Sequence, residues 1–137
     1  MKTLVVMNEK GGVGKTNIVA HAGWFFAEHY RTLVIDLDQQ ANLSATLGAH
    51  LAATHAIDLF AGEAKIEPVG PLTVARSTRD LLRAEAGADM AVVETFRDNL
   101  ASMADDYDVC VIDTPPSLTN RTLSLIHISE PTRRRGI

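Results

Sequence analysis

The chain has 137 residues, of which 46% are apolar and 22% charged, so it is long enough to bury the core of one domain. Its formal net charge of −4 gives no general electrostatic reason to bind nucleic acid. The single cysteine, Cys110, excludes a disulfide framework and a multi-cysteine metal site built by one chain. No apolar run approaches the length of a membrane span, and the N-terminus has no signal-peptide pattern. We therefore expect a cytoplasmic protein.

Short apolar runs at residues 4–7, 33–35 and 109–112 predict strands, and polar or charged residues follow each of them. Hydrophobicity that is continuous rather than alternating, and rich in Val and Ile, indicates strands buried on both faces of a parallel sheet. A fourth strand is expected at residues 72–75. The pattern predicts an α/β fold with a doubly wound, mostly parallel sheet, in which ligands bind at the carboxyl ends of the strands.

Helical periodicity appears twice. Between the first two strands one apolar stripe is expected to face the core, and it consists of Ile18, Ala22, Phe25 and Phe26. We expect Trp24, on the same helix, to pack against the sheet or a neighbouring helix. The second stripe consists of Val92, Val93, Phe96, Leu100 and Met103, and it predicts a helix that ends before Asp105. Shorter helical segments are expected at residues 42–47, 56–61 and 80–86.

The segment after the first strand has the composition of a phosphate-binding loop. It reads Lys10-Gly11-Gly12-Val13-Gly14-Lys15-Thr16, and it precedes the first predicted helix. Glycines let backbone amides converge on a phosphate group, and a helix N-terminus favours an anion. Lys15 should reach the β- and γ-phosphates of a nucleotide, and the Thr16 hydroxyl should bind magnesium. The usual first glycine of such a loop is replaced by Glu9, so the standard pattern fails at one position.

This sequence resembles the deviant Walker A loop of the ParA/MinD (Soj-like) family of P-loop ATPases. The resemblance implies the N-terminal part of a P-loop NTPase fold. It also implies that Lys10 crosses a dimer interface and contacts the nucleotide held by the other subunit, like an arginine finger supplied in trans. Asn17 stands where the family usually has Thr or Ser, although its amide can still bind the α-phosphate. The implied nucleotide-binding set is Gly11, Gly12, Val13, Gly14, Lys15, Thr16 and Asn17.

Two further segments resemble the same family. Residues 35–42 are similar to its D-x-D-P-Q-G-N segment, although Gln39 and Ala41 replace the usual Pro and Gly. By that resemblance Asp38 positions the attacking water and Asp36 supports the magnesium site, together with Thr16. Residues 108–117 resemble the Walker B strand and the switch that follows it, so that Asp113 would hold magnesium through water and residues 114–117 would sense the γ-phosphate. The resemblance thus assigns Lys10, Lys15 and Asp38 to catalysis.

The histidines and the cysteine carry no further site in our interpretation. The five histidines are His21, His29, His50, His55 and His127, and none has ligand spacing with an acid or cysteine. We expect Cys110 to be a small buried core residue. Because only one cysteine exists, the resemblance does not extend to nitrogenase iron proteins, whose cluster needs two per subunit. A GTPase is disfavoured because the chain lacks an Asn-Lys-x-Asp element.

The family resemblance implies an ATPase that works as a dimerisation switch. ATP and Mg²⁺ would close a homodimer and hydrolysis would reopen it. Among relatives, partition of plasmids or chromosomes fits best, with a ParB-like partner protein, non-specific DNA binding and association with the nucleoid. Two alternatives stay open: a MinD-like membrane-associated cell-division ATPase, and a non-catalytic nucleotide-binding module or inert fragment.

The last fifteen residues differ in pattern from the rest of the chain. Residues 123–133 read LSLIHISEPTR, and their back-translation resembles the transposon-end adapter of sequencing libraries. We therefore expect residues 1–122 to be a ParA-like domain that is truncated at its C-terminus, and residues 123–137 to be a non-native tail. The alternative is a genuine basic tail ending in Arg133, Arg134 and Arg135. Since part of a cooperative core would be missing, the chain made alone should aggregate or lack ATPase activity.

Overall fold

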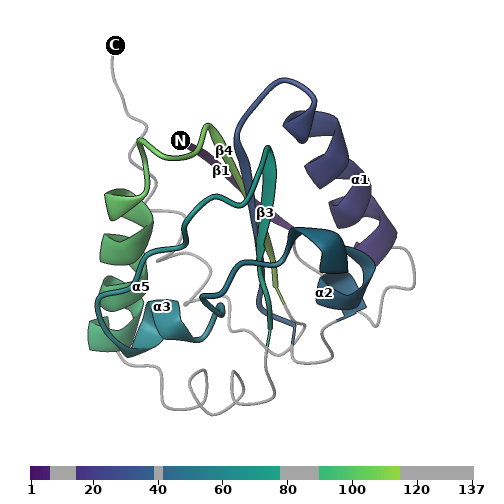
Figure 1. Ribbon diagram of the computed structural model, residues 1–137. Helices are drawn as coiled ribbons and strands as arrows, with labels where there is room; N and C mark the ends of the chain where they lie inside the picture. The colour runs from purple at the N-terminus through teal and green to yellow at the C-terminus, as the bar shows by residue number, and fades with distance from the viewer. Residues whose placement is uncertain (7–14, 39–41, 78–89, 115–137) are drawn as a thin grey trace.

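The computed structural model describes residues 1–6, 15–38, 42–77 and 90–114. They form a four-stranded sheet in the order β1-β4-β2-β3, in which all neighbouring strands are parallel. The strands are β1 (Lys2–Val6), β2 (Thr32–Asp36), β3 (Leu72–Ala75) and β4 (Val109–Asp113). All four expected strands are confirmed, as is the parallel α/β fold. Strands far apart in the sequence, β1 and β4, therefore lie side by side (Figure 1).

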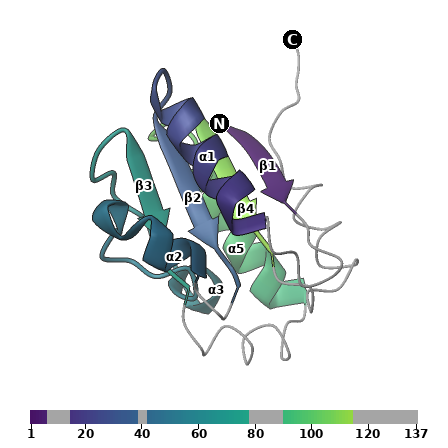
Figure 2. The same cartoon turned by 90° about the vertical axis from the view of Figure 1, so that its right-hand side faces the viewer.

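Helices cover both faces of this sheet, as Figures 1 and 2 show. On one face lie α1 (Lys15–Ala27) and α2 (Asn42–Thr46), and on the other lie α3 (Asp58–Ala61) and α5 (Met90–Ser102). A short 3₁₀ helix, η1 (Gly48–His50), follows α2. The expected helices around residues 42–47, 56–61 and 92–103 are confirmed, whereas the one at 80–86 lies outside the described residues. Within the described ranges no helix is long and apolar enough to span a membrane.

The face under α3 and α5 has a closed core. The predicted stripe of α5 is confirmed at four of its five residues, since Val93, Phe96, Leu100 and Met103 are buried, whereas Val92 is half-buried. Phe96 stacks on Phe60 with ring centroids 4.5 Å apart. Cys110 is also fully buried in this core, as expected. Alternate residues of β2 and β4 supply the sheet side of the core because successive side chains of a strand point to opposite faces.

Buried Asn99 of α5 fixes the chain around α3 to this core. Its amide nitrogen donates to the carbonyl oxygens of Leu59 and Gly62, each at 2.8 Å, and its amide oxygen accepts from the Ala64 N–H at 3.0 Å. Every polar atom of the side chain thus has a partner, which removes the cost of burying it. Asn99 makes α3 part of the same layer as α5.

The prediction for the buried face of α1 is wrong at Ile18 and Phe25, which are 63% and 65% exposed. Ala22 and Phe26 are half-buried, and Phe26 packs against the core on this face of the sheet. The buried residues of α1 are Val19, Ala20 and Gly23. Gly23 lets the helix approach closely, because a Cβ atom there would lie 3.3 Å from Cγ2 of Val34. The helix therefore packs through its small residues and leaves larger ones outside. Trp24, which we expected to pack against the sheet or a neighbouring helix, is 42% exposed and meets the ring of His21, on its own helix, edge-on at 5.6 Å.

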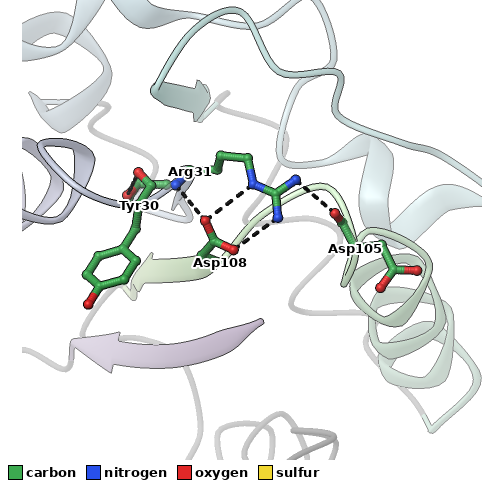
Figure 3. A network of polar contacts seen from close by, with 5 residues as sticks. Tyr30, Arg31, Asp105 and Asp108 are labelled. Atoms are coloured by element: carbon green, nitrogen blue, oxygen red, sulfur yellow. Dashed lines mark hydrogen bonds and ion pairs between the residues drawn. The ribbon is translucent and has the colours of Figure 1, made fainter.

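We call the edge of the sheet where the strands begin the amino edge. An exposed ion pair connects the turn before β2 to the turn before β4 at this edge (Figure 3). Arg31 donates from Nη2 to Oδ1 of Asp108 at 3.0 Å and from its backbone N–H to Oδ2 at 2.9 Å. Its Nη1 also donates to the backbone oxygen of Asp105 at 3.0 Å. The backbone N–H of Asp108 donates back to the Arg31 carbonyl oxygen at 2.8 Å, so these contacts hold β2 and β4 together where both start.

Candidate nucleotide-binding site

The opposite edge, where the strands end, gathers two carboxylates and the entry to the phosphate-loop sequence. We call it the carboxyl edge. Val6 of β1, Asp113 of β4 and Asp36 of β2 are direct neighbours across the sheet. Asp36 and Asp113 come two residues after Val34 and Val111, so they point to the same face, the one covered by α1 and α2. Asp36 is 0% and Asp113 1% exposed. Two carboxylates on adjacent strand ends are thus buried together.

The Asp36 carboxylate organises the turn that follows β2. Its Oδ1 accepts the backbone N–H of Asp38 at 3.0 Å. Its Oδ2 accepts both the hydroxyl of Ser44 at 2.6 Å and the backbone N–H of Ser44 at 3.0 Å. Asp38 itself is half-buried. The two acids of the D-x-D pattern therefore differ in their surroundings: Asp36 is enclosed by donors, and Asp38 retains partial access to solvent.

The pKa of Asp36 is raised to about 6, chiefly by burial and in smaller part by the neighbouring Asp113 carboxylate. Hydrogen bonds from Ser44 and from the Asp38 backbone act in the opposite direction because they stabilise the ionised form. A raised pKa at a buried acid beside a second acid is typical of a site that receives a cation or a reacting group. Carboxylate oxygens are also the ligands that Mg²⁺ prefers, so the donor chemistry of this pair fits the metal that the sequence implies.

Hydrogen bonds between the strand ends fix how the chain leaves the sheet. The Thr114 hydroxyl donates to the carbonyl oxygen of Val6 at 2.7 Å, and the Thr114 N–H donates to the same oxygen at 3.1 Å. The N–H of Leu37 donates to the carbonyl oxygen of Asp113 at 2.9 Å. These bonds tie the last residue of β1 to the residue after β4, and the last residue of β4 to the residue after β2.

The structure places only part of the predicted site residues. Lys15 and Thr16 are the first two residues of α1, and Asn17, which follows them, is exposed. Asp36, Asp38, Asp113 and Thr114 lie at the carboxyl edge. Lys10, Gly11, Gly12, Val13 and Gly14 lie outside the described residues, as do residues 115–117 and His127. Among the residues that are described, no group of three or more His, Cys, Asp or Glu side chains is arranged to hold a metal ion.

Ser44 is the residue that the sequence reasoning missed. It lies eight residues after Asp36, in the short helix α2, and is 5% exposed. Its hydroxyl also accepts the backbone N–H of Ser77, just after β3, at 3.1 Å. The only sequence signal was a Ser near the start of a predicted helix, a position that is common at helix N-termini and does not reveal a contact with Asp36.

Comparison with known proteins shows the family to which this chain belongs. A family profile described as an AAA domain matches residues 1–131. The chain belongs to this family, and its relatives identify it as a ParA/MinD-type P-loop ATPase sequence. It is 38% identical over 131 residues to the protein IncC of Escherichia coli, covering 86% of this chain and 36% of IncC. It is 38% identical over 136 residues to the chromosome-partitioning ATPase Soj of Treponema pallidum, covering 90% of this chain and 52% of Soj.

A solved structure supports the same fold for this ParA/MinD-type chain. Cobyrinic acid a,c-diamide synthase from Mycobacterium smegmatis, with an ATP analogue and magnesium bound, superposes with a TM-score of 0.72 at 28% identity. The match covers 92% of this chain and 55% of the synthase. The chain therefore spans about half the length of that protein and of Soj, and about a third of IncC. What the described residues show is the N-terminal part of the P-loop NTPase fold.

Proposed function

We propose that the complete protein is a ParA-type ATPase, an ATP-dependent dimerisation switch that acts in plasmid or chromosome partitioning. The observation that carries this proposal is the buried pair Asp36 and Asp113 on adjacent strands, next to the strand that leads into the Lys10–Thr16 sequence. The likeness to Soj and IncC supports it. So does the synthase of known structure, which binds an ATP analogue with magnesium on the same fold.

The roles of the site residues follow from their chemistry and from the family. Lys15 and the amides of Gly11, Gly12, Val13 and Gly14 would bind the phosphates, with Asn17 near the α-phosphate. Thr16 and Asp113 would hold Mg²⁺, which when bound neutralises charge on the β- and γ-phosphates. Asp36 would support this metal site, and Asp38 would orient the attacking water. Lys10 would act on the nucleotide of the other subunit.

These proposed roles imply which partners the protein binds. ATP binding by both subunits would complete each active site with the partner's lysine, so the homodimer forms only in the ATP state. A ParB-like protein would stimulate hydrolysis and reopen the dimer, and non-specific DNA would serve as the matrix, in the cytoplasm on the nucleoid. In a binding test, ATP-dependent retention on DNA supports partitioning. Retention on anionic lipid vesicles instead would indicate a MinD-like role at the membrane.

The direct test uses the complete protein with Lys15→Ala and Lys10→Ala variants. Lys15→Ala should abolish ATP binding. Lys10→Ala should retain binding but fail to dimerise with ATP, because its lysine acts only across the interface. Binding is measured by calorimetry, dimerisation by light scattering and turnover by phosphate release. A Lys10→Ala protein that forms ATP-dependent dimers and hydrolyses normally would contradict the role in trans.

We further propose that residues 123–137 are not native to this protein. The family match runs to residue 131, and thus reaches into this segment. The genomic sequence past codon 122 decides whether residues 123–137 come from a sequencing adapter or from the natural gene. A continuous ParA-like reading frame that departs from LSLIHISEPTR would support the adapter origin. A natural gene that encodes the same eleven residues would contradict it.

A further inference from the structure

We propose that Ser44 is a positioning residue for ATP hydrolysis: it holds the Asp36 carboxylate in the orientation that sets the backbone of Asp38. The proposal rests on the proposed function, since Asp38 is taken there as the residue that orients the attacking water. It adds a residue that lies outside the phosphate loop, the D-x-D acids and the Walker B strand.

The contacts of Ser44 join three segments of the carboxyl edge. Its hydroxyl donates to Oδ2 of Asp36 at 2.6 Å and accepts from the Ser77 N–H at 3.1 Å. Its backbone N–H donates to the same Oδ2 at 3.0 Å. The ends of β2 and β3 and the helix α2 thus meet at one hydroxyl group. All three residues of this contact, Asp36, Ser44 and Ser77, are buried, at 0%, 5% and 6% exposure.

The other oxygen of the same carboxylate binds the Asp38 backbone. Oδ1 of Asp36 accepts the Asp38 N–H at 3.0 Å. Because a carboxylate is planar and rigid, a rotation that follows loss of the hydroxyl bond at Oδ2 also displaces Oδ1. A change at Ser44 therefore affects the Asp38 backbone through a single side chain, that of Asp36. Asp38 itself is half-buried, and this bond holds its backbone at the end of β2.

The Ser44–Asp36 hydrogen bond is short and buried, so its loss should have a large effect on the Asp36 carboxylate. A hydrogen bond to an ionised buried carboxylate is stronger than one between neutral groups. At 0% exposure of Asp36, water has no ready access to replace a deleted hydroxyl. Ser44→Ala leaves the Asp36 oxygen and the Ser77 N–H each short of a partner. The Ser44 N–H is retained, so the turn stays folded but is held less firmly.

The test compares Ser44→Ala with Ser44→Thr and Ser102→Ala in the complete protein. Thr keeps a hydroxyl at position 44, and the Ser102 hydroxyl donates to the Asn99 carbonyl oxygen at 2.7 Å on α5, away from the carboxyl edge. We expect Ser44→Ala to lower kcat about tenfold, the loss of one hydrogen bond to a charged group, with KM for ATP changed less than about twofold. Ser44→Thr should restore most of kcat, and Ser102→Ala should leave it unchanged.

A second readout does not depend on turnover. In the nucleotide-free protein, the amide of Asp38 should exchange with solvent deuterium about tenfold faster in Ser44→Ala than in Ser102→Ala or the wild type. Unchanged exchange at Asp38 would overturn the link, and faster exchange with unchanged kcat would overturn the positioning role. If the wild type fails to hydrolyse ATP, the proposed function fails and the positioning role with it, while the exchange data still report whether Ser44 holds Asp38.

Discussion

The two ends of strand β4 place aspartates in opposite surroundings. Asp108, just before the strand, is exposed and faces the guanidinium of Arg31, which lowers the pKa of Asp108 to about 2 (Figure 3). Asp113, at the end of the strand, is buried beside Asp36, and burial raises the pKa of Asp36 to about 6. The same residue type is therefore stabilised in its charged form at the amino edge and disfavoured in that form at the carboxyl edge.

This difference distinguishes a contact that stabilises the fold from residues that are proposed to bind a ligand. A charge that meets an opposite charge in solvent contributes to the folded state, although only modestly. Two buried carboxylates side by side cost stability, and such a cost is typical of a site kept for binding or catalysis. The amino edge thus connects β2 and β4, whereas the proposed function assigns the carboxyl edge to a ligand that brings positive charge.

The largest difference is expected in ATP turnover by the complete protein. Asp38→Ala should lower kcat by about 100-fold or more, the size of effect seen when a group that acts in the transition state is removed. Asp108→Ala should leave kcat within about twofold, since it changes only an exposed ion pair. Phosphate release at saturating ATP and Mg²⁺ measures both. Equal losses in the two variants would mean that the edges do not differ in function.

A smaller difference is expected in the pH dependence of stability without nucleotide or Mg²⁺. The pKa of Asp36 is about 6 in the folded state and near its ordinary value of 3.8 in the unfolded state. Between these values the folded state retains a proton that the unfolded state has released, so this group lowers the free energy of unfolding as pH rises from about 4 to 6. Asp108 acts in the opposite direction at lower pH: it stabilises above its ordinary value, and this contribution is lost as pH falls toward 2.

Urea unfolding of the complete protein at a series of pH values tests this pair. Asp36→Asn should flatten the decline between pH 4 and 6, because the amide has no charge to bury. Asp108→Asn should leave that decline in place and reduce the loss of stability below pH 4. A wild-type protein whose stability rises between pH 4 and 6, with the rise removed by Asp36→Asn, would contradict the environment assigned to Asp36.

The smallest effect is expected at the amino edge itself. Arg31→Ala removes the ion pair with Asp108 and the bond to the Asp105 carbonyl oxygen. Since both partners are exposed, the melting temperature should fall by no more than a few degrees, and less at high salt. Lys65→Ala, which breaks a separate pair with Asp106 at 2.9 Å, is the matched control and should behave alike. A loss of cooperative unfolding in Arg31→Ala alone would show that this edge carries more of the fold.

The sequence predicted the elements of the sheet better than the packing of its helices. Continuous apolar runs identified three of the four strands, and the stripe of α5 identified its buried face, because both depend on local pattern. The stripe chosen for α1 failed at Ile18 and Phe25, since Gly23 lets the small side of the helix approach Val34, a tertiary contact that composition does not reveal. At the site, motifs located Asp36 and Asp113. Their pairing and the contact with Ser44 depend on the strand order β1-β4-β2-β3, which periodicity leaves open.

The most direct test of the central claim is equilibrium binding of ATP to the complete protein, with and without Mg²⁺, in Asp113→Ala and Asp108→Ala variants. The two substitutions lie at opposite ends of β4. If the carboxyl edge is the nucleotide site of a ParA-type ATPase, Asp113→Ala should lose the Mg²⁺-dependent part of the affinity, and Asp108→Ala should bind like the wild type. Unchanged Mg²⁺-dependent binding in Asp113→Ala would contradict the account.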